Sequence, residues 1–216
     1  MIEELSDARI VQSWLRNASP WTDAVREGRI ESRVLVTNRA VLDAVLNRSP
    51  ASVLDIGCGE GWLARVLTAE GKAKGQQPRA IGVDVVPELV DQAARAGGGE
   101  FRVASYEAIA AGALDLTVDL AVANFSLIGR ESVDALLRAS PSLLKPGGAL
   151  VVQTLHPVVT CGDLPYEDGW RPGSWAGCGA NFTDPAPWYF RTLESWVKLF
   201  AESGFRPVRN RLSVDD

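Results

Sequence analysis

Residues 53–61 read Val-Leu-Asp-Ile-Gly-Cys-Gly-Glu-Gly, and this stretch decides the fold. Its apolar start predicts a short buried strand, and three glycines at alternate positions predict a turn in which no Cβ blocks a ligand from the backbone. A helical pattern follows at once, with Trp62, Leu63, Val66 and Leu67 on one face. Strand, glycine turn and helix start form a cradle in which we expect free backbone N–H groups and the helix dipole to face a nucleotide-type cofactor.

The spacing of the glycines and one carboxylate distinguish this turn from a dinucleotide-binding turn. A dinucleotide fingerprint places its third glycine three residues after the second, whereas Gly59 and Gly61 are two apart. Asp55 precedes Gly57 by two residues; a carboxylate there would repel a pyrophosphate and would suit an ammonium group. The alternative, an ordinary tight turn without a ligand, leaves the agreement of acid, spacing and flanking pattern unexplained.

On these residues the chain resembles the class I S-adenosylmethionine (SAM)-dependent methyltransferases, whose first motif has an acid, three glycines and this spacing. The resemblance covers most of residues 35–210, and only this first motif is highly specific. It implies that SAM is the cofactor, that S-adenosylhomocysteine (SAH) is the product, and that Asp55 faces the amino group of SAM. The turn that would hold the methionine part of SAM consists of Gly57, Cys58, Gly59 and Gly61.

Length and composition indicate one soluble globular domain. A chain of 216 residues can bury one good core and is short for two independent domains. No apolar run approaches the ~20 residues that cross a membrane, and the first residues lack the pattern of a signal peptide, so we expect a cytoplasmic protein that binds no membrane. The net charge of −5, with scattered basic residues, argues against a nucleic-acid partner. The odd number of cysteines argues against a disulfide framework.

Strands and helices alternate after the glycine turn, and the strands are apolar throughout. This pattern predicts a parallel sheet covered on both faces. We therefore expect an α/β, doubly wound, Rossmann-like fold with a mostly parallel sheet of the seven-stranded type. Little chain remains for the antiparallel seventh strand of the resembled family, because only residues 213–216 follow, so that strand is lost, supplied by a partner or outside this sequence. The further strands are expected at 80–84, 101–103, 118–123, 149–154 and 205–209, and helices at 87–96, 133–144 and 193–202.

The first fifty residues predict a helical cap in three pieces. An apolar stripe begins at Ile10, Ser19-Pro20 reads as the N-cap and first residue of a second helix, and a third helix covers 39–47. In the resembled family such a preface often roofs the active site. The expected organisation is a single domain with a cap at 1–50, a SAM-binding core at 51–156, a lid at 157–191 and a C-terminal helix and strand at 192–216.

Residues 161–191 are the anomaly of the chain, with five glycines, four prolines and seven of the sixteen aromatic residues. This is far longer than the roughly 12–15 residues at which a structureless loop becomes unusual. We interpret it as a lid whose aromatic side chains wall an apolar pocket; the alternative is an insertion packed on the sheet. Tyr166, Trp170 and Tyr189 are the candidate substrate contacts, and Asp168 is a weaker one.

Asp84 ends the second strand, 29 residues after Asp55. Two carboxylate oxygens match the two neighbouring hydroxyl groups of a ribose, and Val85 beside it is a further candidate cofactor contact. NAD-binding folds use the same chemistry, so this residue alone supports any adenosine cofactor. The alternative is a helix cap before Pro87.

The ends of the third and fourth strands supply the remaining cofactor candidates. The resembled family often has an acidic residue against the adenine amino group, where this chain has Ser105, followed by Tyr106. Asn124 and Phe125 follow the fourth strand, the usual place for groups under the cofactor and beside the acceptor. Phe125 packs on the cofactor or is simply part of the core.

His156, the only histidine, comes directly after the fifth strand. An imidazole there can take a proton from an attacking hydroxyl or amine, although a lone histidine is as readily a structural donor. With Cys161 and Cys178 it lacks zinc-ligand spacing, so we expect no metal. The resembled family often takes an arginine from before the first strand to bind the SAM carboxylate; Arg33 is our candidate, with Arg26 next.

The most economical hypothesis is a SAM-dependent methyltransferase that acts on a small, apolar or aromatic acceptor. The alternatives are a SAM-binding sensor or partner subunit without catalysis, a nicotinamide-dependent oxidoreductase, and a methyltransferase of macromolecules. The sequence leaves open the acceptor, the methylated atom (O, N, C or S) and the oligomeric state, with a homodimer as one option.

Overall fold

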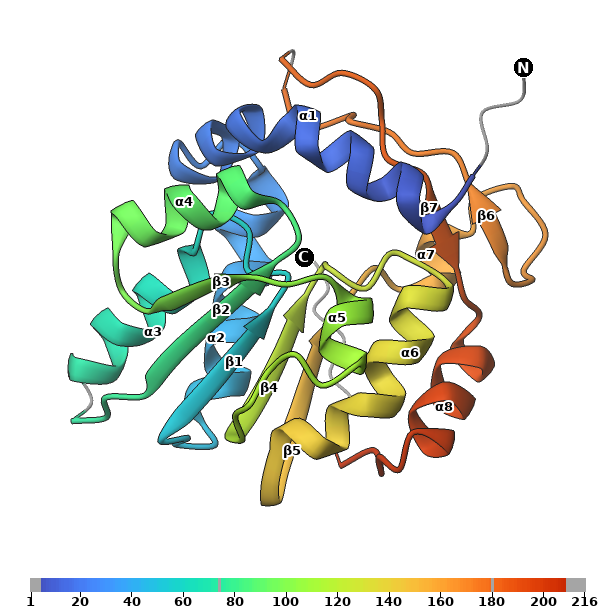
Figure 1. Ribbon diagram of the computed structural model, residues 1–216. Coiled ribbons are helices and arrows are strands. Elements are labelled where there is room, and N and C mark those ends of the chain that lie inside the picture. Colours follow the sequence, from blue (N-terminus) through green and yellow to red (C-terminus); the bar gives the residue numbers. More distant parts are fainter. Residues whose placement is uncertain (1–4, 74, 180, 209–216) are drawn as a thin grey trace.

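The computed structural model describes residues 5–73, 75–179 and 181–208, and its centre is a parallel five-stranded sheet. The strands lie in the order β3-β2-β1-β4-β5 (Figure 1). They are Ser52–Ile56 (β1), Arg79–Asp84 (β2), Glu100–Val103 (β3), Val118–Asn124 (β4) and Leu144–Gln153 (β5). The direction of winding reverses between β1 and β4, and open sheets bind ligands beyond the carboxyl ends of such strands. The predicted doubly wound parallel sheet is confirmed.

Helices cover both faces of the sheet, as the apolar strands require. On one face, Val53 and Val122 pack against α2 (Asn38–Leu46) and α3 (Trp62–Ala73). On the other, Leu54 and Ala121 pack in a cluster with α5 (Tyr106–Ala110), α6 (Glu131–Ala139) and α8 (Leu193–Glu202). Helix α4 (Pro87–Ala96) packs against β2 and β3. Alternate residues of each strand are therefore buried on opposite faces.

The expected break at Ser19-Pro20 is wrong, because α1 (Asp7–Arg26) is one continuous helix with Pro20 inside it. Proline removes one helical hydrogen bond. Apolar packing of residues before and after Pro20 compensates for this loss. Ala18 and the Trp21 ring lie in one apolar cluster with residues that flank the start of α4. Figure 1 shows α1 crossing above the end of the sheet at which β1 and β4 stop. The cap therefore has three helical pieces with other bounds: α1, a π-helical turn η1 (Arg33–Thr37) and α2.

The helix expected over 133–144 is shorter than predicted. Helix α6 ends at Ala139 and a 3-10 turn, η2 (Ser140–Leu143), follows. Pro141 explains the change, because its nitrogen has no hydrogen to continue the α-helical pattern. Strand β5 then starts early, at Leu144, but its regular pairing with β4 begins at Ala149 after a register shift.

The segment expected to be a lid contains regular structure that the sequence did not predict. A short helix α7 (Pro157–Thr160) is followed by an antiparallel ribbon of β6 (Gly169–Arg171) and β7 (Trp188–Phe190). We call residues 172–187, which join the two strands, the strap; Figure 1 shows it beside α1.

The sixth strand expected over 205–209 is wrong for residues 205–208, which form no strand. Here the chain leaves the helix after Gly204 (φ 86°) and none of these residues pairs with β5. Residue 209 and the tail at 213–216 lie outside the described residues. Within the described ranges, no helix has the length and apolarity needed to cross a membrane.

Candidate active site

The glycine turn after β1 depends on close packing that only glycine allows. Gly57 has a φ of 75°, and a Cβ on it would lie 2.4 Å from the Cβ of Ser126. Ser126 is held there because its hydroxyl donates to the Ile56 carbonyl at 2.6 Å. The second residue after β4 thus contacts the turn after β1, which brings the two strand ends together.

The expectation of free backbone N–H groups is wrong for all four residues named in this turn, since the Gly61 N–H donates to the Cys58 carbonyl at 3.1 Å. The N–H groups of Gly57 and Cys58 donate to the Val83 carbonyl at 2.8 and 3.0 Å. The Gly59 N–H donates to Asp84 at 2.9 Å. The end of β2 and the turn itself satisfy these donors, as buried backbone groups require, so at these residues a ligand would be recognised by side chains and carbonyl groups.

A cavity lies above the turn and brings together six of the residues predicted from the sequence. These are Arg33, Asp55, Gly57, Cys58, Gly59 and Asn124. Its walls also include Trp21 of α1 and Trp62 of α3, which the sequence analysis did not assign to the site. Gly61 is not among the lining residues; it packs against α4 and β3, where a Cβ would lie 2.8 Å from that of Ala93.

Arg33 lies between two tryptophans at this cavity. Its guanidinium carbon is 5.4 Å from the ring centre of Trp21 and 5.3 Å from that of Trp62. Its Nε donates to Asn38 at 3.2 Å, and burial lowers its pKa. Such cation–π contacts hold the side chain in place while its remaining N–H groups can bind an anion. Arg26, the second candidate, is instead paired with the buried Glu60.

The carboxyl group of Asp55 supplies a negative charge in the same cavity. Burial, and then the nearby charge of Asp84, raise its pKa to about 7, whereas Arg33 opposes the increase. The cavity therefore offers a cation and a titratable carboxyl group, which fits the carboxylate and ammonium ends of an amino acid. Burial also raises the pKa of the Cys58 thiol, so this thiol is uncharged.

Asp84 accepts two backbone hydrogen bonds at the end of β2. One oxygen accepts from the Gly59 N–H and the other from the Val86 N–H, both at 2.9 Å. Each oxygen keeps a further lone pair, so the ribose role remains a prediction beside this structural one. Burial raises the pKa of Asp84 and the backbone hydrogen bonds oppose it. Val85 packs near Val86 and Trp21.

The candidates for the adenine side have structural roles in the part of the chain described. Ser105 caps α5 by accepting from the Ala108 N–H at 3.1 Å. Tyr106 is half-buried; desolvation of its hydroxyl raises its pKa, and this hydroxyl donates to the Ser126 carbonyl at 2.9 Å. Phe125 adopts a positive φ of 54° and its N–H donates to the Gln153 carbonyl at 2.8 Å. None of the three lines the cavity, so their contact with adenine stays a prediction.

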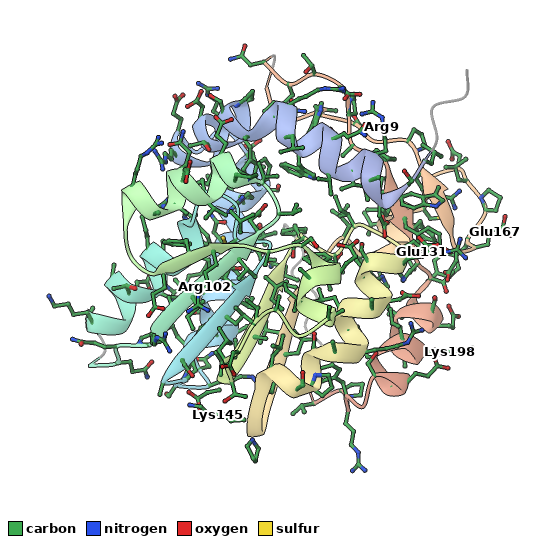
Figure 2. The ribbon with its side chains drawn as sticks, viewed as in Figure 1. Arg9, Arg102, Glu131, Lys145, Glu167 and Lys198 are labelled. Carbon is green, nitrogen blue, oxygen red and sulfur yellow. The ribbon has the colours of Figure 1, made fainter. Side chains whose placement is uncertain are left out.

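The strap is docked on α1 through polar contacts. Asp184 pairs with Arg9 and Arg16, and its carbonyl accepts from Ser13. Asn17 exchanges two hydrogen bonds with the backbone of Thr183, at 2.8 and 3.0 Å. In Figure 2, Arg9 reaches from α1 toward this part of the chain.

An aromatic chain connects the strap to the cavity wall. Trp175 of the strap packs edge-on against Trp14, which packs edge-on against Trp21. The first turn of α1 makes a further long-range contact, because Asp7 accepts from the N–H groups of Arg130 and Ser132, both at 2.7 Å, and so caps α6. Helix α1 thereby joins the cavity, the strap and the loop after β4.

A second, apolar cavity lies under the ribbon. Tyr189 lines it, together with Trp188, Leu127 and Leu155 among others. Trp170 packs edge-on against Tyr189. The Tyr166 hydroxyl accepts from the Leu193 N–H at 2.8 Å, and Asp168 caps α8 by accepting from the Thr192 N–H at 2.7 Å.

His156 precedes α7 and lines neither cavity. Its carbonyl accepts from Thr160, and its buried Nδ1 has no hydrogen-bond partner among the described residues. The buried Oδ1 of Asn124 and Oε1 of Gln153 likewise lack partners there. Over the described ranges, no group of three or more histidine, cysteine or acidic residues is placed to hold a metal ion.

The parallel sheet, the glycine turn and the charged cavity together define a class of protein, the class I SAM-dependent methyltransferases. Within this class, the chain belongs to the methyltransferase-domain family whose model matches residues 29–210. The resemblance inferred from the first motif is confirmed.

Curated relatives and solved structures agree with this family. A ubiquinone biosynthesis O-methyltransferase from Xanthomonas oryzae pv. oryzae is 34% identical over 124 residues, 53% of this chain and 47% of the relative. The chain spans about half the length of the curated relatives it matches. A SAM-dependent methyltransferase from Mesorhizobium loti has a TM-score of 0.54 at 23% identity, covering 77% of this chain and 80% of that one. The DhpI–SAM–HEP complex has a TM-score of 0.54 at 18% identity, covering 92% and 91%. These two likenesses show the fold alone.

Proposed function

We propose that this protein transfers a methyl group from SAM to a small acceptor. The observation that carries the proposal is the cavity in which Arg33 and Asp55 lie above the glycine turn. A guanidinium suits the carboxylate of the methionine part of SAM, and a carboxylate suits its ammonium group. Glycine at position 57 lets Ser126, which follows β4, pack directly on the turn, so the ends of β1 and β4 are held together beside this cavity.

The remaining part of SAM extends the site toward β2. Asp84 stands at the end of that strand with two oxygens that each accept one backbone hydrogen bond. Their free lone pairs suit the two ribose hydroxyls. Trp21 of α1 and Trp62 of α3 also line the cavity, and their apolar rings would help to exclude water from bound SAM.

SAM supplies an electrophilic methyl group on a sulfonium, so that transfer is an in-line displacement that leaves SAH. The protein must then orient the acceptor and exclude water. If the attacking atom is a hydroxyl oxygen or an amine nitrogen, the protein must also accept one proton from it. We assign the role of proton acceptor to His156, whose Nδ1 has no hydrogen-bond partner among the residues described. This histidine follows the end of β5, beside the strand ends that form the site.

We infer that the acceptor has an apolar or aromatic part that lies against the ribbon. The second cavity, with Trp188 and Tyr189, is the surface that supports this inference. Matched relatives are named ubiquinone biosynthesis O-methyltransferases, which favours oxygen as the methylated atom. The three free cysteine thiols, Cys58, Cys161 and Cys178, are in keeping with a cytoplasmic location.

Calorimetric titration with SAM, SAH and NADH in parallel tests the proposal. We expect micromolar binding of SAM and SAH and no binding of NADH. Binding of NADH without a response to SAM would mean that the turn takes a nicotinamide cofactor, and the methyltransferase proposal would be abandoned. SAM binding with no turnover on any acceptor would favour the non-catalytic SAM-binding alternative.

A further inference from the structure

Three neighbouring strand ends carry polar side chains on one face of the sheet. One row of apolar side chains from these strands packs in a single cluster with α2 and α3: Val53, Val122 and Val151. Side chains two residues further along a strand point the same way. Asp55, Asn124 and Gln153 therefore continue this row at the carboxyl edge. The register agrees, because Asp55 pairs with Val122 and Asn124 pairs with Gln153.

Gln153 is the member of this row that no role yet explains. Asp55 and Asn124 line the charged cavity, and Gln153 is the next residue across the sheet from Asn124. Strand β5 is at the edge of the five-stranded sheet, so the space beside Gln153 is not filled by a further strand over the described residues. The Gln153 amide therefore extends the row of polar side chains beyond Asp55 and Asn124, on the side away from β2.

Both amides of this pair have an oxygen that is buried and lacks a hydrogen-bond partner within the described chain. Buried polar atoms in native proteins are nearly always paired, and leaving one unpaired costs stability. Two such oxygens on adjacent strand ends, beside a ligand cavity, indicate a place where a ligand supplies the missing donor.

We propose that Gln153, together with Asn124, binds a hydroxyl or amino group of the acceptor and so selects acceptors that carry an O–H or N–H donor. This inference rests on the proposed function, because it assigns the acceptor side of the same site. It makes Gln153 a specificity-determining residue. An acceptor without such a donor would leave both amide oxygens unpaired, which sites built for hydrogen bonding reject strongly.

Matched pairs of small aromatic probes test the proposal without knowledge of the natural acceptor. The pairs are phenol and anisole, catechol and 1,2-dimethoxybenzene, and aniline and N,N-dimethylaniline; the second member of each lacks the donor. Their affinities are measured by ligand-observed NMR on the protein saturated with SAH. In the wild type we expect the donor-bearing member of at least one pair to bind about tenfold more tightly.

Variants of Gln153 test whether its amide causes the preference for donor-bearing probes. In Gln153→Met, which keeps the side-chain size and removes the amide, we expect the preference to fall below about threefold. Gln153→Glu retains acceptor oxygens and should keep it. Gln76→Met is the matched control, because Gln76 also has an unpartnered buried Oε1 but lies before the amino end of β2; it should behave as the wild type.

The outcomes of these experiments distinguish a failure of the Gln153 proposal from a failure of the proposed methyltransferase function. A wild type that prefers no donor-bearing probe, prefers the methylated ones or binds none of the probes overturns the role of Gln153, whatever SAM does. A preference that persists in Gln153→Met overturns it as well. Failure of SAH to bind in calorimetry refutes the methyltransferase proposal instead, and the probe comparison on the free protein then decides the role of the pair by itself.

Discussion

Arg33 and Asp55 influence each other across the charged cavity that both line. Burial lowers the pKa of Arg33, and the carboxylates of Glu60 and Asp55 oppose that decrease. Burial raises the pKa of Asp55, and the charge of Arg33 opposes that increase. Each group is thus more easily charged because the other is present, and a zwitterionic ligand between them meets an opposite charge at each end.

Replacing Arg33 by leucine should weaken SAM binding by about 10- to 100-fold, the effect of losing a charge-assisted hydrogen bond. The leucine keeps some bulk between Trp21 and Trp62. Decarboxylated SAM provides the sharper comparison, because it lacks the carboxylate that we propose Arg33 binds. Its affinity, measured by calorimetry, should be the same in the variant and the wild type.

Arg29→Leu is the matched control for that experiment, because Arg29 lies on the exposed surface and pairs there with Glu27. Its SAM affinity should be unchanged. If Arg33→Leu weakened SAM and decarboxylated SAM equally, the arginine would be supporting the cavity rather than binding the carboxylate.

The titration of Asp55 predicts a pH optimum for cofactor binding. As the pH falls through about 7, Asp55 gains a proton and no longer attracts the ammonium group, so the affinity for SAH should fall below pH 7. Above about pH 8 an α-amino group loses its own charge, and the affinity should fall again. Calorimetry across this range should show a maximum that Asp55→Asn flattens on the acid side; an unchanged acid limb would contradict the assignment.

The same carboxyl group predicts how folding stability depends on pH. Its pKa is raised from 3.8 to about 7 in the folded protein, so between these values the folded state binds more protons than the unfolded one. The free energy of unfolding therefore decreases as the pH rises from about 4 to about 7. Urea denaturation at several pH values should show this decrease in the wild type, and a smaller one in Asp55→Asn.

A methyl group on Gly57 should disrupt the turn. Gly57→Ala combines a positive φ of 75° with a Cβ only 2.4 Å from that of Ser126, and we expect a loss of about 4 kcal/mol in unfolding free energy. Gly147→Ala has a similar φ of 80° and nothing within 4 Å of its Cβ, so it should cost only about 1 kcal/mol. Equal losses in the two variants would show that backbone strain alone, not the contact with Ser126, makes glycine necessary.

Removing the Asp184 side chain should release the strap from α1. Asp184→Ala breaks the ion pairs with Arg9 and Arg16. Arg16 is 57% exposed, whereas Arg9 and Asp184 are only 12% and 20% exposed, so the loss in global stability should be about 1–2 kcal/mol, above that of a fully exposed pair. Hydrogen exchange of the strap amides should nevertheless become about five- to tenfold faster.

Glu167→Ala is the control for the strap, because the Glu167 side chain projects away from the molecule (Figure 2). It should leave exchange in the strap unchanged. If Asp184→Ala also left exchange unchanged, the hydrogen bonds of Asn17 with Thr183 would be sufficient to hold the strap.

Local signals predicted much of the sheet and of the charged cavity. Helix α4 begins at Pro87 and α8 at Leu193, as expected, because a proline or a cap and an apolar face mark each clearly. Asp55 and the glycines were found from spacing, and Arg33 from the family resemblance. These signals agree with the structure because each depends on residues close together in the chain.

Long-range packing accounts for what the sequence did not show. Ser19-Pro20 is a typical start of a helix when only neighbouring residues are considered. In the structure the packing of Ala18 and Trp21 outweighs this local preference. The N–H groups of the glycine turn were expected to be free, but whether they are depends on carbonyl and carboxylate groups of β2, which local spacing does not reveal. The strands of the ribbon are three residues long, too short to show a periodic pattern.

Helix α1 lies before residue 29, where the match to the family model begins. A chain trimmed to that match would keep the sheet and the glycine turn. It would lack Trp21 from the cavity wall, Asp7 from the start of α6 and the surface on which Asp184 docks. The segment that the family model matches is therefore shorter than the segment that keeps these contacts around the cavity. A protein produced, purified or transplanted for its site should include α1.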